Sequence, residues 1–88
     1  MGDDELNELI EELAEDLAAN DLLIARSEKQ RLTAERMQSR VQGKAAKEAI
    51  ALLADVDRGL MELREVRARR AVLLERAKAL QSKIESDS

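Results

Sequence analysis

The sequence predicts an all-α protein, an antiparallel helical hairpin or coiled coil that completes a helical bundle by homodimerisation. Its 88 residues include no proline and only three glycines, and residues of high helix propensity dominate the rest. Large apolar residues recur three and four positions apart, which is the period of one helix face. Residues 3–16 carry eight acidic and no basic side chains, whereas residues 64–83 carry seven basic and two acidic ones.

The first arm of the predicted hairpin spans residues 4–42. Acidic residues at its amino end complement the helix dipole. Its apolar stripe consists of Leu6, Leu9, Ile10, Leu13 and Leu17. Asn20 and Asp21 can either break this arm, with Asp21 capping a second helix, or lie within one continuous helix. Both alternatives stay open, and apolar residues become sparse beyond this point.

The predicted turn lies near Gly43, because glycine adopts the left-handed conformation at a helix end without steric cost. The second arm, residues 44–84, has the clearest heptad repeat. Its position a holds Ala49, Val56, Leu63, Arg70, Ala77 and Ile84, and its position d holds Ala45, Leu52, Gly59, Val66, Leu73 and Leu80. Position e adds Ala46, Leu53, Leu60 and Leu74, and so wide an apolar face needs more than one neighbour. We expect one domain, residues 1–88, with frayed ends at 1–3 and 85–88.

Charge favours the hairpin over its alternative, a single long helix that assembles only with other copies. An antiparallel hairpin places the acidic start of the chain beside its basic end, while parallel copies of one helix would stack like charges. Arg70, at position a, is a candidate for a polar group that sets the register by meeting Glu12, Glu15 or Asp16.

The composition argues against an enzyme and against a cofactor or metal site. The chain has no cysteine or histidine, which removes thiol nucleophiles, imidazole bases and the usual zinc ligands. We therefore predict no catalytic, cofactor-binding or metal-binding residues. No apolar run is long enough to span a membrane, and the lack of cysteine fits a cytoplasmic location.

The predicted function is that of a non-enzymatic interaction protein, such as an adaptor, assembly factor or inhibitor, that binds another macromolecule through its helix faces. The expected partner is a protein of unknown identity, and the expected state is a homodimer or higher oligomer. The predicted association face consists of Leu52, Leu53, Val56, Leu60, Leu63, Val66, Leu73, Leu74 and Leu80. Arg36, Arg40 and Lys44, four residues apart on one helix face, are predicted to add an electrostatic contact.

Two alternative functions use the charged segments. The basic segment 26–47 could bind nucleic-acid phosphates, although the chain has no aromatic residue to stack on a base. The acidic face could instead imitate those phosphates and block a nucleic-acid-binding protein, or simply neutralise the arginines of the second arm. That face consists of Glu8, Glu11, Glu12 and Glu15.

Overall fold

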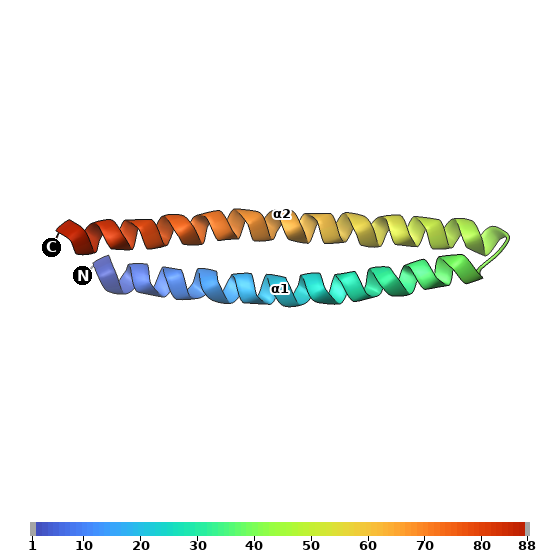
Figure 1. Ribbon diagram of the computed structural model, residues 1–88, viewed down its shortest axis with the longest axis horizontal. Helices are drawn as coiled ribbons and strands as arrows, with labels where there is room; N and C mark the ends of the chain where they lie inside the picture. The colour runs from blue at the N-terminus through green and yellow to red at the C-terminus, as the bar shows by residue number, and fades with distance from the viewer. Residues whose placement is uncertain (1, 88) are drawn as a thin grey trace. The chain divides into compact units, whose positions relative to one another are not determined.

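The protein is a hairpin of two long helices, which confirms the predicted fold class. The computed structural model describes the backbone of residues 2–87 and the side chains of residues 4–87. Helix α1 spans Gly2–Arg40, helix α2 spans Lys44–Asp87, and they run in opposite directions (Figure 1). Residues 2–87 contain no strand. Compared with the predicted arms, α1 starts and ends two residues earlier, and α2 continues three residues further, into the segment that was expected to fray.

Helix α1 is continuous through Asn20 and Asp21, which settles the alternative that the sequence left open. Neither residue forbids a helical backbone, and no proline interrupts the segment. The side chain of Asn20 is only 2% exposed, making it the most buried side chain in the described part of the molecule. Its tertiary contacts therefore override its modest helix propensity.

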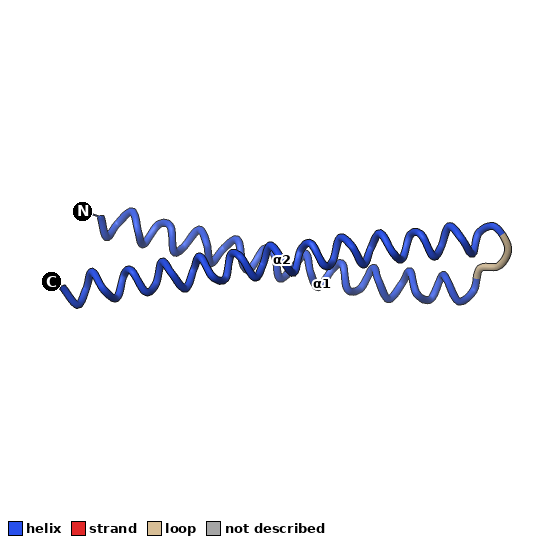
Figure 2. Tube along the Cα trace, turned by 90° about the horizontal axis from the view of Figure 1, so that it is seen from above, coloured by secondary structure: helices blue, strands red, loops and turns tan. Residues whose placement is uncertain are grey.

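The turn between the helices occupies residues 41–43 and is the one non-helical segment among residues 2–87 (Figure 2). Gly43 has a φ of 70°, the left-handed conformation that the sequence predicted for it. The backbone N–H of Val41 still donates to the carbonyl of Met37 at 3.1 Å, so the helical hydrogen bonding of α1 extends one residue past Arg40. The carbonyl of Gly43 accepts from the N–H of Ala46 at 3.1 Å and thereby opens α2.

The chain divides into two compact units, each containing antiparallel parts of both helices. Unit 1 comprises Met1–Asp21 and Val66–Ser88, so it joins the start of α1 to the end of α2. Unit 2 is the continuous segment Leu22–Glu65, which contains the turn. No segment of α1 or α2 within the described residues is both long and apolar enough to cross a membrane.

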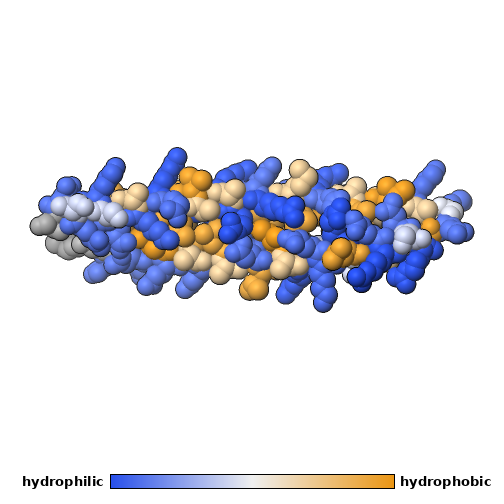
Figure 3. All heavy atoms as spheres, viewed as in Figure 1, coloured by the Kyte–Doolittle hydropathy of each residue, from blue (hydrophilic) through white to orange (hydrophobic). Residues whose placement is uncertain are grey.

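In each unit the helices pack through a single row of side chains, which we call the seam. In α2 the seam uses positions a and e of the predicted heptad, since a spacing of four and three residues also follows one helix face. The buried apolar seam residues are Leu6, Leu74 and Ala77 in unit 1 and Ala34, Ala49 and Leu60 in unit 2. With three of these six being alanine, the seam is thin, and apolar side chains stay visible among the polar ones at the surface (Figure 3).

Candidate interaction surface

The predicted association face is divided between two places in the structure. Five of its nine residues lie in the seam, where they are buried or half-buried: Leu53, Val56, Leu60, Leu63 and Leu74. Three others, all at position d, are exposed: Leu52, Leu73 and Leu80. Val66 also occupies position d and is half-buried. Positions a and e of α2 therefore pack against α1 in the seam, and position d lies on one side of it.

Helix α1 adds its own apolar residues to that side, and together they form what we call the apolar strip. The strip consists of Leu9, Leu73 and Leu80 in unit 1 and of Leu23, Met37 and Leu52 in unit 2. These six side chains are between 42% and 50% exposed, and they make up six of the eleven exposed large apolar residues in the described part of the chain. The strip therefore holds three of the four exposed large apolar residues described in unit 1 and three of the seven described in unit 2.

A groove accompanies the strip in each unit. In unit 1, Leu9, Leu73 and Leu80 line a groove whose floor includes the seam residues Leu6 and Ala77. In unit 2, Met37 and Leu52 line a groove over Ala34 and Val56, with Arg26 and Lys29 at its edge. Each groove exposes mainly carbon atoms and a few charged groups at its border, a surface that suits the apolar face of another helix.

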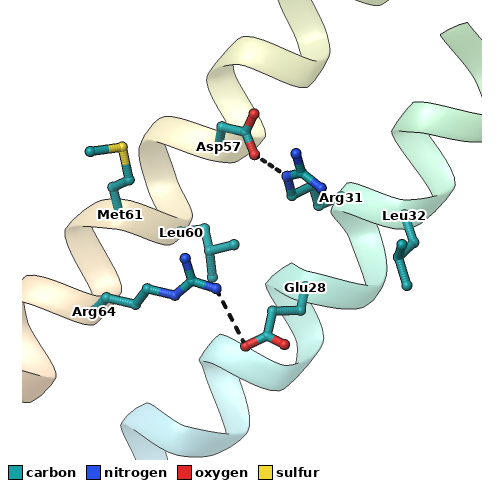
Figure 4. A pocket seen from close by; sticks show the side chains of 7 residues that line it. All are labelled: Glu28, Arg31, Leu32, Asp57, Leu60, Met61 and Arg64. Atoms are coloured by element: carbon teal, nitrogen blue, oxygen red, sulfur yellow. Dashed lines mark hydrogen bonds and ion pairs between the residues drawn. The ribbon is translucent and has the colours of Figure 1, made fainter.

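Ion pairs between the helices close the other side of the seam in unit 2 (Figure 4). Arg64 Nη2 lies 3.8 Å from Glu28 Oε1, and Arg31 Nε donates to Asp57 Oδ1. Arg31 Nη1 also lies 2.8 Å from Glu35 Oε1 in the next turn of α1. Figure 4 shows Leu60 between the two pairs that join the helices, with Leu32 and Met61 at the rim of the same groove. On this side of the seam the charged side chains form their ion pairs with residues of the same chain.

A similar pair occurs in unit 1, where Arg67 Nε donates to Asp21 Oδ1. Hydrogen bonding to Asp21, with the attraction of its charge, raises the pKa of Arg67 above the ordinary value. Hydrogen bonding to Asp57, followed by the attraction of Asp57 and Glu35, likewise raises the pKa of Arg31. Both guanidinium groups therefore stay protonated.

Arg70 also serves as a polar seam residue, but its partner differs from those predicted. Its Nη1 donates to Oδ1 of the buried Asn20 and not to Glu12, Glu15 or Asp16. Asn20 continues the seven-residue spacing of Leu6 and Leu13, which places it in the seam, whereas Glu12, Glu15 and Asp16 are exposed. The amide accepts a charge-assisted hydrogen bond without bringing a second charge into the seam.

The residues predicted to make an electrostatic contact are exposed in unit 2. Arg36, Arg40 and Lys44 lie at and beside the turn, and Arg40 Nε donates to the carbonyl of Arg36 at 3.3 Å. Arg31, which belongs to the same basic segment, is instead held by Asp57 and Glu35. The positive charge available to a ligand in this segment is therefore smaller than the sequence indicated.

The acidic face lies in unit 1, and all four of its residues are exposed: Glu8, Glu11, Glu12 and Glu15. They are not members of the ion pairs described above, of which the pair of Asp21 with Arg67 joins the two helices in unit 1. Folding thus places the acidic segment beside the basic one, with the acidic face exposed. No group of three or more potential metal ligands occurs within the described part of the chain.

Sequence reasoning missed the contribution of α1 to the apolar strip. Leu9, Leu23 and Met37 belong to one series at a spacing of seven or fourteen residues, which is a repeat of the helix face. Asp16 and Gln30 interrupt that series and hide it. The same spacing would have placed Asn20 in the seam. No known family, characterised protein or solved structure matches this chain.

Proposed function

We propose that this protein is a non-enzymatic interaction protein, acting as an adaptor, assembly factor or inhibitor, which binds another macromolecule through the apolar strip. A homodimer or higher oligomer is part of the proposal, as is a cytoplasmic location, which the cysteine-free composition supports. The proposal places no catalytic residue in the chain.

The difference between the two sides of the seam carries the proposal. On one side of the seam the charged groups form ion pairs within the chain, as those of Arg31, Arg64 and Arg67 do. The other side holds the six large apolar side chains of the strip, which are about half exposed, whereas Leu32 and Met61 are the exposed large apolar residues that line the groove on the ion-paired side of unit 2. Exposed apolar surface that is concentrated in this way is typical of an interaction site, whereas scattered apolar residues are not.

Two neighbouring residues of α2 allow a matched test. Leu73 belongs to the strip and is 49% exposed, while Val72 is 50% exposed and lies outside the strip. Leu73→Glu is expected to weaken self-association by at least about tenfold, because it places a charge in the interface. It is also expected to abolish retention of a partner that binds the strip, as tested with an extract of the source cells. Val72→Glu is expected to leave both properties unchanged.

Sedimentation equilibrium and affinity capture measure the two effects, with circular dichroism to verify that each variant is still helical. Equal effects of Leu73→Glu and Val72→Glu would refute a role for the strip. Binding of nucleic acid that survives Leu73→Glu but is lost on Arg36→Glu with Arg40→Glu would replace it with the basic-segment alternative. Capture of a basic protein that requires Glu8, Glu11, Glu12 and Glu15 would favour the acidic-mimic alternative.

A further inference from the structure

We propose that the occupant of the apolar strip is a second copy of this chain, paired by a two-fold axis parallel to the helices, so that both turns lie at the same end. This inference rests on the proposed function and deepens it by naming the partner and its register. It follows from charged residues along the strip that are complementary only when a second copy is present.

The register within the hairpin is regular. Asn7 is hydrogen bonded to Gln81 and Asp21 to Arg67 in unit 1, and Arg31 to Asp57 in unit 2. A residue a given number of positions further along α1 therefore lies level with the residue the same number of positions earlier in α2. The same register places other residues of the two helices at equal levels, whether or not they touch.

One heptad position lies three residues after and four residues before the series that forms the strip, which is Leu9, Leu23 and Met37 in α1 and position d in α2, and it shares their helix face. We call rim residues those charged members of this position that are level with a charged member in the other helix. Asp55 and Arg69 occupy the same position in α2 but are level with Thr33 and Ala19. In unit 1 the rim of α1 is acidic, with Glu5 and Glu12, and that of α2 is basic, with Arg76 and Lys83. In unit 2 the rim of α1 is basic, with Arg26 and Arg40, and that of α2 is acidic, with Glu48 and Glu62. All eight are exposed, and among the described residues no ion pair joins any two of them.

The register pairs these rims level by level with opposite charge. In unit 1 Glu5 is level with Lys83 and Glu12 with Arg76. In unit 2 Arg26 is level with Glu62 and Arg40 with Glu48. Within one hairpin the two members of each pair lie on opposite borders of the strip, one on α1 and the other on α2, so they do not meet.

A two-fold axis parallel to the helices brings α1 of one copy over α2 of the other at the same level. All four pairs then meet across the interface, and each occurs twice in the dimer. Because unit 1 pairs with unit 1 and unit 2 with unit 2, this complementarity is present in each unit by itself. Two apolar pairs match as well, since Leu9 meets Leu80 of the other copy and Met37 meets Leu52, whereas Leu73 comes level with Asp16.

The exposed area of the chain is sufficient for such an interface. The chain exposes 6933 Å², and a stable dimer interface takes about 800 Å² from each partner. Antiparallel neighbours throughout also give the usual arrangement of a four-helix bundle.

A charge-exchange experiment tests this pairing in the full-length chain. The first variant is Glu12→Arg, the second is Arg76→Glu, and the third combines both. Each single variant places like charges at two symmetry-related positions of the dimer. We expect each to raise the dimer dissociation constant about tenfold at low salt, as measured by sedimentation equilibrium. The combined variant is expected to recover the original affinity.

Mixing the two single variants gives the decisive result. Their heterodimer restores an attractive pair at both positions, so an equimolar mixture is expected to associate about as tightly as the unchanged protein. Native mass spectrometry of chains with different masses measures the heterodimer directly. The matched control is Glu11→Arg, also exposed on α1 but outside the rim, which is expected to leave association unchanged.

Three results would overturn the pairing while leaving the proposed function intact. A mixture of Glu12→Arg and Arg76→Glu that associates no better than either variant alone would show that these residues do not meet between copies. Weak energy transfer between dyes on Gln42→Cys in both copies would place the two turns at opposite ends. A chain that is monomeric under all these conditions, yet still loses a partner on Leu73→Glu and not on Val72→Glu, would assign the strip to a different protein.

Discussion

Replacing Asn20 with alanine tests whether the seam of unit 1 depends on its buried polar contact. Asn20 is 2% exposed and accepts a hydrogen bond from Arg70. A hydrogen bond to a charged group contributes about 1.5–3 kcal/mol to stability, and its loss leaves the guanidinium without that acceptor. We therefore expect Asn20→Ala to lower the free energy of unfolding by about 2–3 kcal/mol. For a domain of this size such a loss lowers Tm by roughly 8–24 °C.

Asn7 provides the matched control in the same helix and unit. It is exposed and accepts a hydrogen bond from Gln81, so Asn7→Ala is expected to change stability by less than about 0.5 kcal/mol. Urea unfolding followed by circular dichroism, at one fixed protein concentration for every variant, measures both. The reasoning is refuted if Asn20→Ala costs no more than Asn7→Ala.

The double variant Asn20→Leu with Arg70→Leu separates stability from register. Replacing both partners with apolar residues leaves no unsatisfied group and buries additional apolar area, so we expect a gain of about 1–3 kcal/mol. The same change removes the polar pair that distinguishes the native alignment from one shifted by a heptad. Stability equal to that of Asn20→Ala alone would show that the polar contact is not what limits this part of the seam.

Two further predictions concern the backbone and the seam of unit 2. Gly43→Ala is expected to destabilise the hairpin by about 1 kcal/mol, because φ at this position is 70°. Gly59→Ala is expected to stabilise it by about 1 kcal/mol, because Gly59 is helical and a Cβ there would meet no other atom. Opposite changes in the free energy of unfolding in urea support both assignments, and changes of the same sign contradict them. Leu63→Glu places a charge in the seam and is expected to lower helicity, oligomer mass and Tm together, while unchanged circular dichroism would remove Leu63 from the seam.

The helical hairpin could be predicted from the sequence because its signals are local and strong. The missing prolines, the helix-forming composition and Gly43 each act on nearby backbone. The charge layout then selected the antiparallel orientation, which needs no knowledge of individual contacts. These features determined the number of helices, the place of the turn and the direction of each helix.

The division of the apolar face of α2 could not be predicted in the same way. Positions d and e both carry leucines next to position a, as Leu52 and Leu53 or Leu73 and Leu74 show. Either position combined with position a gives the spacing of a helix seam. The choice depends on which face α1 presents, and α1 has a polar residue, Asn20, in its own seam. Which of the two positions packs in the seam therefore depends on tertiary contacts, and the periodicity of one helix does not predict it.

The arrangement of the two units along the chain has a consequence for the order of folding. Unit 2 is one continuous segment around the turn, so its contacts close short loops at little entropic cost. Unit 1 joins residues as distant as Asn7 and Gln81, and forming it first would close a loop of most of the chain. Contacts are therefore expected to form first around the turn and last between the start of α1 and the end of α2, so that the acidic segment gains its neighbour only in the final stage of folding.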